Sequence, residues 1–169
     1  DARKLDRVNA QLVSPGSKHL PFVVAARQLA RIASMANNNP PTDYTGLVAS
    51  GLTPGSAEWE YTERDFALKS GSSTVAIRND AVVLQDTVTF YHPDGDEDPA
   101  FRYVVDIVKL QNIIYNVNAI FEGKPWAGAA LIPDNQVTTN PLARQPKAAK
   151  AELFSLTDNL AATARMVQS

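Results

Sequence analysis

Hydrophobic and polar positions repeat with different periods along this chain, and each change of period marks a new element. Apolar residues at helical spacing in "PFVVAARQLARIASMA" predict a helix that begins at Pro21 and ends before "NNNPP". A shorter helix is predicted in "ERDFALKS", with Thr62 as its N-cap, Asp65 completing a capping box and Gly71 after its last turn. The Gly-, Pro- and Ser-rich residues 37–58 between these helices are expected to form a lightly structured loop.

Alternation with a period of two follows the short helix and is typical of strands. "TVAIR" and "AVVLQ" flank an Asn-Asp pair at 79–80, which favours a type I′ hairpin turn. Counting outward from this turn pairs Ile77 with Val82 and Val75 with Leu84. All four side chains then share one face of the hairpin, and we expect that face to be buried.

The second half of the chain is predicted to be mainly helical. Apolar residues spaced three and four apart predict a long helix over about 100–122, apolar on two flanks and therefore central in the core. We expect the inner face of the hairpin to pack on this helix. A last helix is predicted from Pro146 to Val167, after a loop in which Trp126 is a candidate anchor.

The order of these elements indicates an α+β fold, with long helices packed on a small antiparallel β-hairpin sheet with open edges. Residues 1–20 are expected to be a leading segment with a short strand within 7–13, and residues 21–169 one core domain. No segment after residue 20 alternates well enough to cover both edges of the hairpin, so both edges are expected to stay unpaired within one chain. Because the chain begins at Asp1 without an initiator methionine, we expect it to be a fragment of a longer protein.

Composition excludes several functional classes. The chain has 169 residues, a net charge of −2 and 44% hydrophobic residues, as a globular domain with its own core would have. The small net charge gives no global attraction to nucleic acid or to an anionic membrane, and no apolar run approaches the ~20 residues of a membrane span. With no cysteine in the chain, disulfides, thiolate nucleophiles and Cys-ligated zinc are excluded.

The acidic segment "DGDEDP" is the strongest candidate for a metal site. Asp94, Asp96 and Asp98 match the opening of a calcium-binding loop. Such a loop also needs a glycine at its sixth position and a bidentate glutamate at its twelfth, where this chain has Pro99 and Val105. We therefore expect a solvated turn in which Asp98 caps the following helix, and no bound metal or cofactor.

The remaining residues carry no catalytic signature. The two histidines, His19 and His92, lie in no metal-ligand spacing, and the chain has no nucleophile elbow or phosphate-binding loop. Four acidic residues gather near Trp59, and a hydrolase or sugar-active domain would draw its carboxylates from them: Glu58, Glu60, Glu63 and Asp65. We expect them to belong to a solvated first helical turn.

Residues 60–91, "EYTERDFALKSGSSTVAIRNDAVVLQDTVTFY", resemble the C-terminal domain of contractile-tail sheath proteins of bacteriophages. In that family a short helix with a Glu-Arg start ends in a glycine, and two strands joined by a tight turn lead to a Thr-Thr-Tyr-type motif. The matching positions are Glu63, Arg64, Leu68, Gly71, Val75, Val82, Val88, Thr89 and Tyr91. The resemblance extends over roughly residues 20–167 through "FRYVVDIVKLQNIIYNV", whereas Asp86 and Phe90 replace the Arg and second Thr usual in the family.

The resemblance implies a structural subunit of a phage tail sheath rather than an enzyme. Copies would assemble in stacked rings around the tail tube protein and contract to drive the tube through the host envelope, without nucleotide or metal. The implied location is the virion, after assembly in the host cytoplasm. In the family, arms of neighbouring subunits add strands to the hairpin, so this chain without arms is expected to be a monomer. The candidate strand-edge residues are Thr74, Val75, Ile77, Val82, Leu84, Val88, Thr89 and Tyr91.

Two alternatives stay open on the sequence alone. The same motifs fit the sheath of a related contractile injection system or of an R-type bacteriocin. The other alternative is a small hydrolase or sugar-active domain built on the acidic cluster near Trp59. An enzyme predicts a concave pocket with perturbed carboxylates, whereas a sheath domain predicts an exposed sheet edge.

Overall fold

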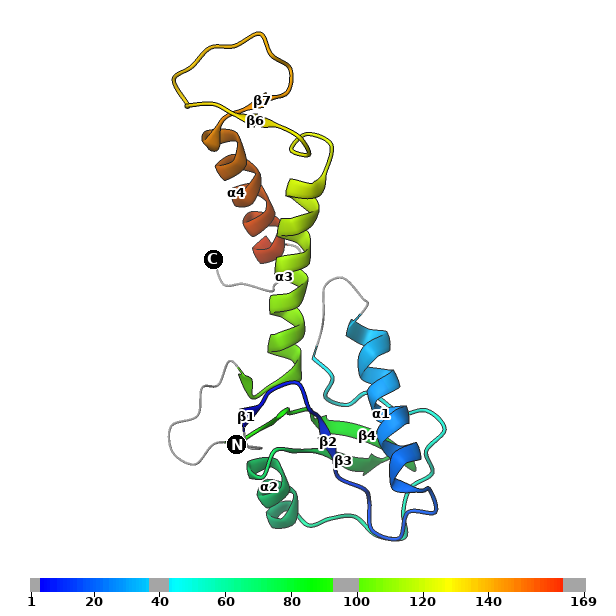
Figure 1. The fold of residues 1–169 in the computed structure, drawn as a ribbon. Helices are drawn as coiled ribbons and strands as arrows, with labels where there is room; N and C mark the ends of the chain where they lie inside the picture. Colours follow the sequence, from blue (N-terminus) through cyan, green and yellow to red (C-terminus); the bar gives the residue numbers. More distant parts are fainter. Residues whose placement is uncertain (1–3, 37–42, 93–100, 163–169) are drawn as a thin grey trace. The chain divides into compact units, whose positions relative to one another are not determined.

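The computed structural model describes residues 4–36, 43–92 and 101–162 (Figure 1). The helices are α1 (Pro21–Ala36), α2 (Tyr61–Lys69), α3 (Val104–Glu122) and α4 (Pro146–Ala162). The strands are β1 (Lys4–Leu5), β2 (Ala10–Gln11), β3 (Ser72–Arg78), β4 (Ala81–Asp86), β5 (Phe90–Tyr91), β6 (Ala130–Leu131) and β7 (Ala143–Arg144). This combination of helices and small sheets confirms the α+β class.

The chain divides into two compact units, residues 1–108 and residues 109–169, and the boundary falls inside α3. The sequence pattern predicted one core domain over 21–169 and set residues 1–20 apart. In the structure, that leading segment contributes β1 and β2 to the first unit.

The central sheet of the first unit has the strand order β2-β3-β4. β3 and β4 form the predicted antiparallel hairpin, and both cross-strand pairs predicted for its buried face are present. The turn is of the predicted type, since Asn79 and Asp80 have φ angles of 51° and 58° and a type I′ turn needs positive φ at both positions. β2 adds a parallel strand at the other edge of β3, so the sheet is mixed.

The core of the first unit is built between the hairpin and α1, rather than between the hairpin and α3. The buried core cluster contains Ile32, Tyr44, Ala49, Val75, Val82 and Leu84. From α3 only Val104 and Val105 of its first turn pack against this cluster, and no residue of α3 is buried. Within the first unit, the predicted packing of the hairpin on this helix is therefore present only at the first turn of α3. The prediction that the helix is central in the core is wrong, because none of its residues is buried.

The segment between α1 and α2 is more ordered than its composition predicted. Tyr44 has no exposed surface, and Val48 forms a bridge with Val83 of β4. Gly46 and Gly51 supply φ angles of 82° and 78°, which residues with a Cβ rarely adopt. Residues 43–58 contain no helix or strand, as predicted, and the contacts of Tyr44 and Val48 hold this loop against the core. Residues 37–42 lie outside the described part.

A second ladder joins the N-terminal residues to the end of the hairpin. β1 pairs antiparallel with β5, and Phe90 donates its backbone N–H to the Val8 carbonyl at 2.6 Å. Thr89 donates its backbone N–H to the Arg102 carbonyl at 2.8 Å, in the turn that leads to α3. Residues 87–91 are therefore held by partners from both the N-terminal segment and the start of α3.

α2 begins with a different capping box from the predicted one. Glu60 is the N-cap; its side chain accepts the backbone N–H of Glu63, and the Glu63 carboxylate accepts the backbone N–H of Glu60 at 2.9 Å. Thr62 and Asp65 lie inside the helix, so they do not cap it. Two overlapping capping boxes fit this stretch of sequence, Glu60 with Glu63 and Thr62 with Asp65, and the structure forms the first of them. Gly71 follows the helix as predicted, with a φ angle of 76°.

The second unit contains most of α3, together with α4 and the parallel pair β6 and β7. Trp126 is 9% exposed, meets Phe121 edge to face at 5.3 Å and donates its indole N–H to the Glu152 carboxylate at 3.1 Å. These contacts give Trp126 the anchoring place that the sequence predicted. The predicted end of the last helix at Val167 lies outside the described residues.

Candidate assembly surface

The eight residues predicted for assembly lie together on the hairpin and its continuation, and most of them are buried. Six expose at most 4% of their surface, namely Thr74, Val75, Val82, Leu84, Val88 and Thr89. Ile77 and Tyr91 are half-buried. These side chains therefore belong mainly to the packed interior of the first unit.

The outer edge of β4 is occupied by residues of the same chain. Ala49 donates its backbone N–H to the Val82 carbonyl at 2.9 Å. Leu84 donates its N–H to the Leu47 carbonyl at 2.9 Å and accepts the N–H of Gly46 at 2.7 Å. The segment before α2 therefore fills the place along β4 where a neighbour's strand was expected.

The outer edge of β3 also has partners within the chain. β2 lies parallel to its first residues, and Leu12 donates its backbone N–H to the Ser73 carbonyl at 2.9 Å. Further along β3, Ile77 donates its backbone N–H to the Glu58 carboxylate at 3.1 Å. The prediction that both edges stay unpaired within one chain is therefore wrong.

The physical reason for these filled edges is the demand of a buried backbone for hydrogen bonds. An unpaired buried N–H or carbonyl costs about 1–3 kcal/mol, so a hairpin packed into a core recruits nearby chain. The recruited pieces are a strand of two residues, β2, and an irregular segment with no strand period. Neither produces the alternation by which strands are recognised in a sequence.

Asn9 and Ser73 form a structural connection that the sequence pattern did not predict. The Ser73 hydroxyl, which has no exposed surface, accepts the Asn9 side-chain amide at 2.8 Å and the Val88 backbone N–H at 2.9 Å. The same hydroxyl donates to the Val88 carbonyl at 3.0 Å, and Asn9 donates to that carbonyl too. No local motif signals this contact, because Asn9 and Ser73 are 64 residues apart.

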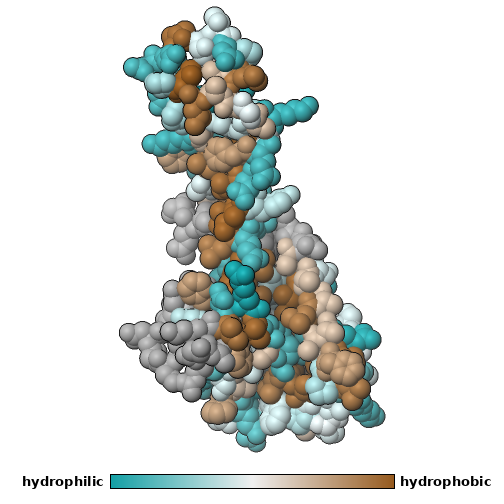
Figure 2. All heavy atoms as spheres, viewed as in Figure 1, coloured by the Kyte–Doolittle hydropathy of each residue, from teal (hydrophilic) through white to brown (hydrophobic). Residues whose placement is uncertain are grey.

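Exposed apolar side chains provide an alternative to strand edges as contact surfaces. On α3, Leu110 is 50% exposed, Ile114 59% and Tyr115 71%, although this helix was predicted to be covered. On α1, Phe22 is 69% exposed. Figure 2 shows hydrophobic residues at the surface of both units, among polar ones. Exposed apolar side chains are candidate contacts with other proteins where they are neighbours on one surface, as Leu110 and Ile114 are, one helical turn apart on α3.

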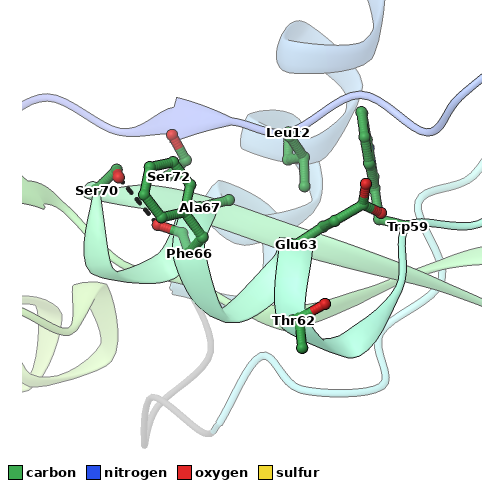
Figure 3. Close-up of a pocket in the computed structure, with 8 residues that line it drawn as sticks. All are labelled: Leu12, Trp59, Thr62, Glu63, Phe66, Ala67, Ser70 and Ser72. Carbon is green, nitrogen blue, oxygen red and sulfur yellow. Dashed lines mark hydrogen bonds between the residues drawn. The ribbon is translucent and has the colours of Figure 1, made fainter.

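A hollow of about 520 Å³ lies beside α2, between this helix and β2 (Figure 3). Its walls include Leu12, Trp59 and Phe66, and Glu63 is the one charged residue among those that line it. The Trp59 indole is fixed by a hydrogen bond to the Val13 carbonyl at 2.8 Å. The Phe66 ring is 73% exposed, so it both borders the hollow and projects from the helix.

A second hollow, of about 560 Å³, lies within the second unit. Phe121, Trp126, Leu131 and Leu153 supply apolar walls, and Lys150 is the one charged residue that lines it. Leu131 is 73% exposed at this site. The two hollows thus differ in the sign of their charged lining residue.

The acidic cluster near Trp59 is engaged in local structural contacts. Glu58 pairs with Arg64, Asp65 pairs with Lys69, and Glu60 and Glu63 cap α2. Each carboxylate thereby has a role in shaping or starting the helix. No observation at this cluster favours the hydrolase alternative.

A metal centre finds no support in the described part of the chain, where no group of three or more His, Asp or Glu side chains could hold an ion. The predicted turn with Asp94, Asp96 and Asp98 lies outside that part. Among the described residues, no helix is both long and apolar enough to cross a membrane.

Comparison with known proteins leaves the function to be argued from the chain itself. No family model matches the chain, and a search of curated proteins finds no match either.

Proposed function

We propose that this chain is a structural subunit of a contractile phage tail sheath, which assembles around the tail tube and contracts to drive the tube through the host envelope. The observation that carries the proposal is the fold of residues 60–91. α2, the glycine at its end, β3, the tight turn and β4 follow one another as the resemblance to sheath C-terminal domains implies. The Thr89 and Tyr91 positions of the family motif then lie at the end of the hairpin.

The exposed apolar side chains support a role in binding other protein chains. Leu110, Ile114 and Tyr115 lie within two turns of α3, each at least half exposed. Leaving such residues in water is unfavourable by about 25 cal/mol per Å² of apolar surface. In this proposal they are covered by further copies of the subunit in stacked rings and by the tail tube protein.

The filled hairpin edges change how subunits are joined in this proposal. A strand from a neighbour would have to displace residues 46–49 from β4, which costs the hydrogen bonds at Val82 and Leu84. The proposal therefore places the main subunit contacts on side-chain surfaces. The prediction that the isolated chain is a monomer rests on the arms that it lacks, and it stays a prediction.

The location and cofactor needs follow from the proposed role. The subunit would be part of the virion and would assemble in the host cytoplasm. Contraction would release energy stored in the extended lattice, so the subunit would need no nucleotide or metal. The sheath of a related injection system or of an R-type bacteriocin belongs to a different particle. Its subunit would assemble and contract in the same way, also without nucleotide or metal.

Electron microscopy tests the proposal. The complete reading frame that encodes this chain is expressed in bacteria, and purified material is examined by negative staining over a range of salt concentrations. Hollow, striated tubes or stacked rings are the expected result. Gold-labelled antibodies against this chain should also mark the sheath of contractile particles made by the source of the gene. Discrete particles without tubes at every salt concentration, and no label on contractile particles, would contradict the proposal.

A further inference from the structure

We propose that the hollow beside α2 binds a small organic cation, an alkylated ammonium ion, whose positive group lies between the Trp59 indole and the Glu63 carboxylate. The rest of the ligand lies along the apolar wall that ends at Phe66. This binding function is separate from the proposed sheath role and does not depend on it. Three features of the hollow carry the proposal: two aromatic rings, apolar surface between them, and a single carboxylate without a cationic partner.

Two aromatic rings border the hollow, which has a volume of about 520 Å³. In the view of Figure 3, Trp59 and Phe66 lie at opposite ends of the hollow, and Leu12 lies between them. The face of an aromatic ring attracts a cation within about 6 Å of its centre, and the attraction is strongest for tryptophan. An alkylated ammonium ion fits this lining, because it combines a positive charge with carbon groups that pack on apolar walls.

Glu63 is the only charged residue among the described residues that line the hollow. Its carboxylate accepts the backbone N–H of Glu60 at 2.9 Å, and Glu60 directly follows Trp59 in the chain. This hydrogen bond holds the carboxylate near Trp59, and Figure 3 shows the Glu63 side chain pointing toward the indole. A carboxylate has further acceptor positions, so the capping role leaves Glu63 able to face a cation.

The basic residues of α2 do not neutralise the Glu63 carboxylate. Arg64 pairs with Glu58 at 2.7 Å. Lys69 pairs with Asp65 at 2.8 Å, and neither basic residue lines the hollow. Glu63 itself forms no ion pair with another residue in the described part of the chain. A ligand that covered this carboxylate without a positive charge would remove its water at a cost, so a cation is favoured over a neutral or anionic ligand.

The other polar groups of the hollow do not favour a sugar or a metal ion. The Ser70 hydroxyl donates to the Phe66 carbonyl at 2.9 Å, so this donor is already engaged. A sugar brings many hydroxyl groups that each need a partner when they are buried, whereas Leu12 and Ala67 offer none. A metal ion needs several oxygen ligands, and Glu63 is the only carboxylate among the described lining residues.

Both recognition groups are held in place without a ligand. The Trp59 indole N–H donates to the Val13 carbonyl at 2.8 Å, and the capping box fixes Glu63. Groups that are fixed in advance lose little conformational freedom on binding, which favours affinity. Glu63 is exposed, so we expect a dissociation constant on the order of 1 mM for an ion as small as choline.

NMR titration of the purified chain with choline chloride at constant ionic strength tests the site. We expect the indole N–H resonance of Trp59 to shift with saturation, while that of Trp126 in the second unit stays in place. The neutral isostere 3,3-dimethylbutan-1-ol has the shape of choline without its charge, and it should bind about fivefold more weakly or worse. Equal binding of choline and the isostere, equal shifts of both resonances, or no shift of Trp59 would overturn the proposal. This comparison needs no variant.

The length of the ligand tests the apolar wall. Hexyltrimethylammonium should bind more tightly than choline, because its chain covers apolar surface of the hollow. Phe66→Leu should weaken the binding of this longer cation, whereas Phe22→Leu should not. Phe22 is the matched control because it is 69% exposed on α1 and Phe66 is 73% exposed on α2. Equal affinity for the two cations, or equal effects of the two substitutions, would contradict the place assigned to the chain of the ligand.

Glu63→Gln and Glu60→Gln separate the ligand contact from the helix cap. Both substitutions remove one negative charge and keep an acceptor in the capping box, but only Glu63 lines the hollow. We expect Glu63→Gln to weaken choline binding about fivefold or more and to abolish the preference over the neutral isostere. Glu60→Gln should change the affinity for choline less than about twofold, because exposed charges outside the site are screened by salt. Equal effects of the two substitutions would show that the carboxylate of Glu63 does not contact the cation, and would overturn the proposal.

Discussion

The Asn9 side-chain amide donates a hydrogen bond to the Ser73 hydroxyl at 2.8 Å, across 64 residues of sequence. Ser73 is fully buried and also exchanges hydrogen bonds with the Val88 backbone. One hydroxyl thus joins the N-terminal segment, β3 and the end of the hairpin.

Ser73→Ala should lower the free energy of unfolding by about 1–3 kcal/mol, because it leaves buried polar partners unsatisfied. Urea titration followed by circular dichroism measures the change, and Ser72→Ala at the neighbouring half-buried position is the control. Asn9→Ala should cost less when combined with Ser73→Ala than on its own, since the two share one network. Strictly additive effects would show that the two side chains act independently.

Leu84→Ala should lower the free energy of unfolding by about 2–5 kcal/mol, because a fully buried leucine leaves a cavity. The sequence alone led us to expect the same range for Ile77→Ala. Ile77 is only half-buried, so we now expect roughly half that cost or less. Chemical denaturation of both variants checks the order, and an Ile77 effect equal to or larger than the Leu84 effect would contradict the observed core.

Tyr44 gives a prediction about high pH. Burial raises the pKa of its hydroxyl above the ordinary value of 10.0, and the hydroxyl has no hydrogen-bond partner among the described residues. Because the folded pKa is the higher one, the contribution to stability is complete below about pH 10 and is lost as the pH rises through the folded pKa. Tyr44→Phe should therefore be neutral or stabilising at pH 7 and should reduce the loss of stability above about pH 10.

Urea midpoints at neutral and alkaline pH measure the Tyr44 effect. Tyr61→Phe is the control, because Tyr61 is 73% exposed and its hydroxyl is hydrated in both states. A Tyr44→Phe protein that loses stability at alkaline pH as steeply as the unaltered protein would rule out this origin of the pH dependence.

Ala49→Pro should destabilise the fold, because it deletes the N–H that Ala49 donates to the Val82 carbonyl. The expected loss is about 1–3 kcal/mol from the unsatisfied carbonyl, with any backbone strain in addition. Ala49→Gly keeps the donor and serves as the comparison in thermal unfolding. If the proline variant were as stable as the glycine variant, residues 46–49 would not be a firm partner of β4.

Calcium should not bind saturably at micromolar concentration to the segment that contains Asp94, Asp96 and Asp98. The positions where a calcium loop needs a glycine and a bidentate glutamate hold Pro99 and Val105. Isothermal titration with calcium chloride measures this directly. A saturable heat that disappears in an Asp96→Asn variant would mean that this segment is a metal site after all.

The hairpin could be predicted from the sequence because its determinants are local. The Asn79-Asp80 turn fixes the register, and the register places Val75, Val82 and Leu84 on one face. Which helix covers the hairpin is determined by contacts between residues far apart in the sequence. An apolar stripe on α3 indicates a surface that favours burial, but it does not tell which element or which molecule covers it.

The candidate site was predictable only in part for a related reason. The sequence located the hairpin residues. In the structure most of them are buried, and the segment that pairs with β4, which includes Gly46 and Leu47, has no strand periodicity by which it could be recognised. The two hollows combine residues from separate elements, as Leu12 and Phe66 do beside α2. A pattern read along the chain cannot bring such residues together.

The long separation between Asn9 and Ser73 also has a consequence for protein synthesis. Residue 9 leaves the ribosome before its hydrogen-bond partners at residues 73 and 88 have been made. At roughly 5–20 residues per second, the delay is on the order of several seconds. During that interval β1 and β2 have no sheet to join, because their partners β5 and β3 have not yet been made.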